Sequence, residues 1–348
     1  MIALGLLLGL ICVTPFVVTY VLIIRWCDRF EPEPWWLLIC AFVWGALFAT
    51  MGGGVSSGIG EGIAMAITGV SDVQDEGIQA FGATVLAPIF EEGFKGIGVA
   101  LIAGLSAMGL KELDGPLDGA IYGGIVGLGF TLTEDILYVS RQFAEAGLPG
   151  FAVLLFVRTV LLGLSHCTFT ACTGLGFGIA AASKSKGVKL FAPLVGWGTA
   201  MLMHAVHNGL PTLGGGMGTA VMIVGSWVID MAYFAILGML VTRERRIIIR
   251  ELLDEVGSLL SVKELPLLTS YFQLARHNWR YFMDRGPRAY NEVRKKQEAL
   301  IALAFVKARR QGTALESSYR APNADLGAEE QKLRTFIANA TARGVVIE

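Results

Sequence analysis

Long apolar segments dominate this sequence. A helix needs about 20 mostly apolar residues to cross the roughly 30 Å of hydrocarbon in a bilayer. The chain is 54% hydrophobic and only 16% charged, which is too apolar for an ordinary soluble domain. Seven segments meet the length requirement: 2–24, 35–51, 79–110, 117–140, 151–182, 190–210 and 219–241. The sequence therefore predicts an all-α polytopic membrane protein with about seven transmembrane helices.

The basic residues predict an orientation. Lysine and arginine in short loops favour the cytoplasmic side of a membrane. They gather at alternate ends of the predicted spans: Arg25 and Arg29, Lys111, Lys184 with Lys186 and Lys189, and Arg243 with Arg245 and Arg246. We expect the N-terminus outside, seven crossings and the C-terminus in the cytoplasm.

The chain changes character after residue 242. Residues 1–242 carry a net negative charge, whereas residues 243–348 carry a net positive charge and charged helical periodicity. We predict a transmembrane domain over 1–242 and a cytosolic helical tail over 243–348, with segments near 265–283, 288–310 and 326–342. An ordinary soluble appendage is favoured, and binding of the tail to anionic headgroups is the alternative.

Two adjacent glutamates, Glu91 and Glu92, interrupt the third apolar segment. An acid at bilayer depth costs about 2.5 to 3.5 kcal/mol on insertion scales, so it predicts a functional site. Residues four apart share a helix face, whereas adjacent residues diverge by about 100°. We expect Glu91 to pair with Lys95 and Glu92 to face another partner.

The fourth and fifth spans carry further polar residues. Glu134 and Tyr138 are four apart and can line one face, while Asp135 points elsewhere, towards the outer interface. His166 lies within the fifth span, and Arg158 is a buried charge that requires an acid.

The sixth span carries His204, His207 and Asn208 within five residues, which predicts one buried polar cluster. A carboxylate or histidine can activate water, and histidine or asparagine can stabilise an oxyanion. The same residue types can hold zinc with water as a further ligand, although no HExxH motif is present. The candidate zinc ligands are Glu91, Glu92, Glu134, His166 and His204.

Several of these motifs together resemble the PrsW family of intramembrane proteases. The resemblance covers roughly residues 25–210 and rests on their order and spacing. It departs from the family pattern at Asp135, where asparagine is common, and does not cover the tail. The motifs are DRFEPEP at 28–34, EEGFK at 91–95, DGAIY at 118–122, GLGF at 127–130, EDILY at 134–138, His166, and HxxxN at 204–208.

The resemblance implies a peptidase for membrane-anchored substrates, with anti-sigma factors as the associated class. The wider clan, which includes the CAAX prenyl proteases, implies a glutamate-activated water with histidine and asparagine at the oxyanion. The family's frequent label of metalloprotease implies zinc dependence instead. We expect a bacterial cell membrane, no nucleic-acid partner and, in the leading interpretation, no required cofactor.

We predict that Glu91 or Glu92 is the general base. Glu134 and His166 would orient the water or carry protons, and His204 with Asn208 would stabilise the oxyanion. Lys95, Tyr138 and His207 would support the site, with Lys95 balancing charge. An ion-coupled transporter with a glutamate and histidine relay is the main alternative, and a membrane scaffold is a third.

Overall fold

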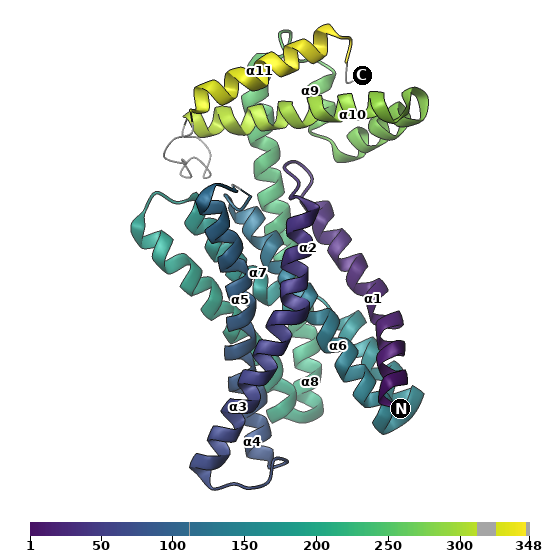
Figure 1. Cartoon of the computed structure of the whole chain (residues 1–348), viewed down its shortest axis with the longest axis vertical. Coiled ribbons are helices and arrows are strands. Elements are labelled where there is room, and N and C mark those ends of the chain that lie inside the picture. The colour runs from purple at the N-terminus through teal and green to yellow at the C-terminus, as the bar shows by residue number, and fades with distance from the viewer. Residues whose placement is uncertain (111, 312–324, 346–348) are drawn as a thin grey trace. The chain divides into compact units, whose positions relative to one another are not determined.

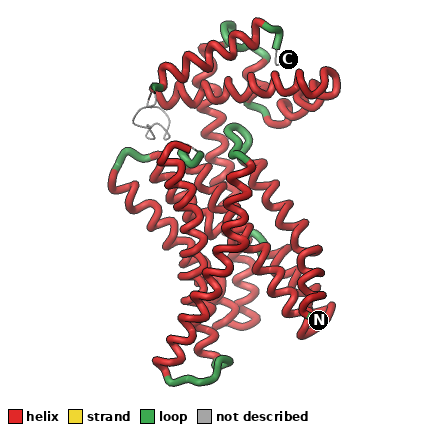
Figure 2. The backbone as a smooth tube through the Cα atoms, viewed as in Figure 1, coloured by secondary structure: helices red, strands yellow, loops and turns green. Residues whose placement is uncertain are grey.

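The computed structural model describes residues 1–110, 112–311 and 325–345, so Lys111 and part of the predicted tail lie outside the described residues. Helices account for nearly all of the described chain, and no strand occurs in it (Figure 2). The chain divides into two compact units. The first comprises Met1–Cys27 and Glu33–Leu237, and the second comprises Asp28–Pro32 and the chain from Gly238 onward.

Five helical stretches are long and apolar enough to cross a membrane: Ile2–Cys27, Trp35–Thr68, Glu76–Leu110, Pro116–Ala182 and Lys186–Glu255. The last two contain 67 and 70 residues. At 1.5 Å per residue, each would measure about 100 Å if straight, which is far more than one crossing requires. Both stretches must therefore turn back within the first unit.

The helices of the first unit follow one another with few loops (Figure 1). Short π-helical turns continue several of them without a break. In chain order they are α1 (Ile2–Cys27), α2 (Trp35–Val43), η1 (Trp44–Ala49), α3 (Thr50–Thr68), α4 (Glu76–Phe81), η2 (Gly82–Leu86), α5 (Ala87–Leu105), η3 (Ser106–Leu110), α6 (Pro116–Leu155), η4 (Phe156–Leu161), α7 (Ser165–Ala182) and α8 (Lys186–Leu252).

Two glycines supply the reversals. Gly147 in α6 and Gly215 in α8 have φ values of 66° and 53°, a region that residues with a Cβ rarely adopt. After Gly147 the chain returns antiparallel to itself, because Arg158 contacts Glu134. After Gly215 it does the same, since His207 bonds to Ser226. The described chain thus has seven apolar segments, which confirms the predicted all-α membrane fold.

Small residues let α6 and α7 pack in direct backbone contact. A Cβ on Gly119 would lie 2.1 Å from the carbonyl oxygen of Gly174, and one on Gly127 would lie 2.2 Å from that of His166. Both distances are far inside van der Waals contact. Interfaces of this kind are typical of transmembrane helices, where close packing replaces the hydrophobic effect. The contact at Gly127 also determines where α7 holds His166.

Replacing Gly127 with alanine is expected to destabilise the protein by about 1 to 3 kcal/mol, because the methyl group must push α7 away. Gly225→Ala is the matched control, since a Cβ there meets nothing within 4 Å. The control should unfold at an unchanged or slightly higher temperature in detergent. Equal unfolding temperatures for the two variants would contradict the packing argument.

The second unit is built around buried ion pairs. It contains η5 (Leu253–Glu255), α9 (Glu264–Leu268), α10 (Tyr271–Gln311) and α11 (Leu326–Ala342), and α10 bends at Gly286, where φ is 80°. Lys296 Nζ lies 2.8 Å from Glu264 Oε1, and Lys307 Nζ lies 2.7 Å from Glu255 Oε1. Burial alone would lower the pKa of the Lys307 amine, but its bonds to acids outweigh burial and raise it. These pairs join helices that the sequence alone could not pair.

Candidate active site

A buried cluster of charged side chains lies inside the first unit. Glu91, Glu92 and Lys95 project from α5, Glu134 from α6, His166 from α7 and His204 from α8. The side chains of Glu92 and Lys95 are fully buried, and that of Glu91 is 13% exposed. Four helices thus bring together five of the six predicted catalytic residues.

Lys95 occupies the centre of the cluster. Its Nζ atom lies 2.8 Å from Glu92 Oε1 and 3.1 Å from His166 Nδ1. The same ammonium group sits 3.6 Å from the centroid of the Phe130 ring. A cation over an aromatic face is stabilised by the ring quadrupole. The lysine side chain is therefore held in place on several sides.

The expected ion pair of Glu91 with Lys95 is present, with Glu91 Oε2 3.8 Å from Lys95 Nζ. The expectation that Glu92 faces away from Lys95 is wrong, because Glu92 Oε1 lies closer to the same atom, at 2.8 Å. Residues three apart also share a helix face, so both spacings were available to the lysine. The two glutamates nevertheless converge on the same neighbours, because their side chains are long enough to bend towards Lys95.

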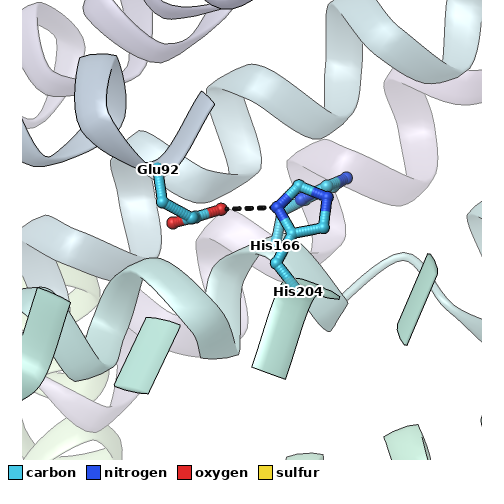
Figure 3. Close-up of side chains that lie close together, drawn as sticks. All are labelled: Glu92, His166 and His204. Atoms are coloured by element: carbon cyan, nitrogen blue, oxygen red, sulfur yellow. Dashed lines mark hydrogen bonds and ion pairs between the residues drawn. The ribbon is translucent and has the colours of Figure 1, made fainter. Parts of the chain in front are cut away.

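His204 contacts both glutamates. Its Nδ1 atom lies 3.1 Å from Glu92 Oε1, and its Nε2 atom lies 3.8 Å from Glu91 Oε2. Figure 3 shows the Glu92 carboxylate facing the imidazole rings of His204 and His166. The centroids of these two rings are 5.0 Å apart. His204 is thus positioned by Glu92 and presents its second nitrogen towards Glu91.

The two glutamates differ in how fully they are bonded. Glu92 accepts hydrogen bonds from Lys95 on Oε1 and from Thr170 on Oε2, the latter at 3.1 Å. Glu91 Oε2 is buried and has no hydrogen-bond partner among the described residues. Thr170 was missed by sequence reasoning, although it lies four residues after His166 on the same helix. Glu92 is an anchored group, whereas Glu91 retains a free acceptor.

A second group of charges extends the cluster along α6. Glu134 Oε2 lies 2.8 Å from His166 Nε2 and 2.5 Å from Arg158 Nη2. Arg158 also bonds to Asp135 Oδ1 at 2.9 Å and lies over the ring of Tyr138. Arg158 therefore has the acid that the sequence required. The ring of Tyr138, on the same face as Glu134, helps to hold the guanidinium.

Asp135 is buried within the protein, and its residue is only 2% exposed. Its location near the outer interface stays a prediction. Its second carboxylate oxygen accepts a hydrogen bond of 2.8 Å from Thr159. The partners of Asp135 are 23 and 24 residues away in the chain, across the reversal at Gly147. The spacing of residues along α6 could not identify these partners, because they lie on a different helical segment.

The hydrogen-bond partners of His166 and His204 indicate which ring nitrogens carry a proton. A lysine ammonium can only donate, so His166 Nδ1 accepts from Lys95 and His166 Nε2–H donates to Glu134. This assignment comes from the bonding network. His166 is thus a neutral imidazole that links Lys95 to Glu134. His204 in turn donates its Nδ1–H to Glu92.

His207 and Asn208 lie outside the set of carboxylate contacts. The Asn208 amide donates to the main-chain oxygen of Ala83 at 2.9 Å, which ties α8 to η2. His207 Nδ1 lies 3.1 Å from the hydroxyl of Ser226, and its ring packs against Phe169. Neither residue bonds to a cluster acid. The oxyanion role of Asn208 remains a prediction.

Glu92, His166 and His204 offer ligand atoms that all lie within 4.8 Å of one another. One carboxylate and two imidazoles are a donor set used by catalytic zinc. However, Glu92 Oε1 and His166 Nδ1 both accept hydrogen bonds from the Lys95 ammonium. A divalent ion would compete with this cation for the same lone pairs and be repelled by it. The residues do not fit a zinc ion in this arrangement.

Comparison with known proteins identifies the family of this chain. No curated protein and no solved structure matches the chain. A family model described as the PrsW family intramembrane metalloprotease matches residues 33–240. The matched range contains every acid, histidine and lysine of the cluster. The chain therefore belongs to the PrsW family of intramembrane proteases.

Proposed function

We propose that this membrane peptidase hydrolyses a peptide bond of a membrane-anchored protein with a water molecule activated by Glu91. The observation that carries the proposal is the free acceptor on Glu91. Its buried Oε2 atom has no hydrogen bond within the described chain and lies 3.8 Å from both Lys95 Nζ and His204 Nε2. Both separations exceed hydrogen-bond distance, so this acceptor stays available to a water molecule. A water held there would have a base and two nitrogen groups beside it.

In the first step, the oxygen of the water attacks the substrate carbonyl carbon while Glu91 takes a proton from the same water. The carbonyl π electrons move to the oxygen, which becomes an oxyanion. Preorganised positive groups stabilise such a charge more in a dry site than in water. Lys95 supplies a permanent positive charge. His204 can donate from Nε2 when that nitrogen also carries a proton, because its Nδ1–H is directed at Glu92.

In the second step, the tetrahedral intermediate collapses and the C–N bond breaks. Protonated Glu91 returns its proton to the leaving amine, so the carboxylate is regenerated. Glu134 and His166 hold Lys95 in place throughout. Asn208 uses one of its two amide hydrogens on Ala83, and we assign the other to the oxyanion.

The zinc-dependent version of this hydrolysis is the alternative suggested by the family description. It requires Lys95 to leave the space between Glu92 and His166. Lys95 is fully buried, held by a carboxylate, an imidazole and an aromatic ring. These contacts favour the metal-free mechanism. Family membership likewise favours a peptidase over the ion-coupled transporter considered from the sequence.

Metal removal tests the proposed mechanism. The purified protein should retain its activity on a membrane-anchored reporter after incubation with a chelator, because Lys95 supplies the positive charge of the site. Elemental analysis of the active fraction should find far less than one zinc per chain. The control is the same chelator saturated with zinc beforehand. Activity that disappears with the chelator and returns with added zinc would overturn the metal-free mechanism.

We further propose that substrates are membrane-anchored regulatory proteins of the anti-sigma class, and that the N-terminus lies outside and the C-terminus in the cytoplasm. The orientation is supported by the basic residues at alternate ends of the spans. Labelling of cysteines introduced near each terminus, from each side of sealed vesicles, tests the orientation. Labelling of both termini from the same side would contradict it.

A further inference from the structure

A mostly apolar cavity with one acid in its lining lies in the first unit, and the proposed chemistry makes no use of it. It has a volume of about 260 Å³ and lies where α1, the break between η4 and α7, and the second half of α8 meet. A water molecule needs only about 10 to 15 Å³ of such space, so this cavity can hold a much larger group. Its lining includes Tyr20, Leu161, Leu164, Trp227, Asp230 and Phe234.

Asp230 is the polar residue of this cavity that demands an explanation. It is 9% exposed and lies near the middle of the seventh apolar segment. Its described bonding consists of one hydrogen bond, a 2.6 Å contact from the hydroxyl of Thr168. Across the described chain no lysine, arginine or histidine pairs with it. An acid at this depth is expensive and normally has a partner or a function.

Two acids of the active-site cluster, unlike Asp230, have cationic partners. Glu92 pairs with Lys95, and Glu134 pairs with Arg158. Both cations are therefore already committed to the active-site cluster. A second copy of the chain could not supply either one to Asp230 without dismantling its own cluster. A positive charge that pairs with Asp230 would therefore come from another molecule.

The walls of the cavity suit a cation. Tyr20 donates its hydroxyl to the main-chain oxygen of Thr159 at 2.9 Å, and Trp227 donates its indole N–H to that of Leu161 at 2.8 Å. Their polar atoms are therefore used within the protein, while both side chains line the cavity. Aromatic faces beside a carboxylate are a recurrent arrangement for binding lysine, arginine and other organic cations.

The cavity opens towards the lipid. Trp227 is 51% exposed and Met231 is 63% exposed, although both lie on a transmembrane helix. A lipid headgroup resides at the interface and would have to leave it to reach mid-membrane Asp230. A side chain carried by a membrane-spanning helix reaches this depth without that cost.

We propose that this cavity receives the lysine or arginine side chain of a transmembrane helix from another protein, with Asp230 as its counter-ion. The apolar body of the partner helix packs against the exposed surface of α8 around Trp227 and Met231. The carboxylate and the aromatic faces then select a helix with a basic residue near its centre. The partner is a regulatory subunit rather than the substrate, since the site is separate from the cluster around Lys95.

Binding of synthetic transmembrane peptides in proteoliposomes tests this proposal. Three leucine-based peptides differ only at the centre, which is lysine, leucine or glutamate, and energy transfer to the labelled protein measures association. The central-lysine peptide should bind roughly tenfold more tightly than the leucine peptide, a difference equivalent to about 1.4 kcal/mol. The glutamate peptide should bind less tightly than both.

Asp230→Asn is the diagnostic variant, because asparagine preserves the size of the side chain and can still accept from Thr168. It should abolish the preference for lysine and leave peptidase activity unchanged. Glu145→Gln, which removes an exposed acid paired with Arg141, is the matched charge control and should preserve the preference. Equal binding of the lysine and leucine peptides would overturn the proposal. Persistence of the preference in Asp230→Asn, or equal binding of a peptide with lysine at its end, would also overturn it.

Discussion

Replacing Glu91 with glutamine is expected to lower kcat by about 10² to 10⁴-fold, the usual contribution of a positioned general base. Glutamine has nearly the same shape as glutamate but cannot take a proton from water. The replaced Oε2 atom has no hydrogen bond within the described chain, and its charged neighbours are 3.8 Å away. The folded structure should therefore tolerate the change well.

The measurement is single-turnover cleavage of a membrane-anchored reporter, combined with thermal unfolding in detergent. Glu92→Gln is the matched control, since it makes the same chemical change one residue later. That variant weakens contacts to Lys95, His204 and Thr170, so it should lower the unfolding temperature more than Glu91→Gln does. If Glu91→Gln keeps nearly full kcat while a stably folded Glu92→Gln is inactive, Glu92 is the base instead.

Much of the fold was predictable from the sequence because each membrane span must satisfy its own backbone. Length and hydropathy therefore located seven apolar segments. Two of the reversals, at Gly147 and Gly215, occur inside continuous helical stretches, and positive φ values mark them in the structure. The seven segments could be counted from composition, but the packing of α6 against α7 depends on which glycines face each other.

The sequence predicted which residues form the candidate site, but it predicted few of the contacts between them. Acids and histidines inside a membrane span cost free energy, so their presence in an apolar segment indicates a functional site. Their partners depend on tertiary structure: Thr170 bonds to Glu92 across 78 residues, and Thr159 bonds to Asp135 across a helix reversal. Threonine is common in apolar helices and has no large insertion cost, so the sequence does not mark these two threonines as site residues. The ammonium group of Lys95 lies closer to Glu92 than to Glu91, and this difference depends on side-chain rotamers that helix geometry does not determine.

The position of Lys95 joins the stability of the cluster to its chemistry. Its ammonium group contacts the anchored glutamate, the neutral His166 and the ring of Phe130. In the proposed mechanism, this lysine supplies the charge that a metal ion supplies in other hydrolases, without requiring an open coordination site. Its replacement should therefore affect folding, catalysis and metal affinity together, each for a separate physical reason.

Lys95→Met is expected to destabilise the protein by about 3 to 5 kcal/mol, because it leaves Glu92 buried without its counter-ion. Adding Glu92→Gln should restore part of this loss, since the double variant buries no unpaired charge at that position. A coupling of about 0.5 to 3 kcal/mol is typical of residues in contact. Both variants should be nearly inactive, because the oxyanion has lost the positive charge beside Glu91.

Metal binding gives a readout that a purely structural lysine would not change. Without the ammonium group, the lone pairs of Glu92, His166 and His204 become available, and this donor set suits zinc. Lys95→Met, purified with zinc present and then desalted, should retain about one zinc per chain, whereas the parent protein retains far less. The double variant with Glu92→Gln lacks the carboxylate ligand and should lose this zinc again. Equal zinc content in the parent and in Lys95→Met would show that Lys95 does not exclude a metal ion from the cluster.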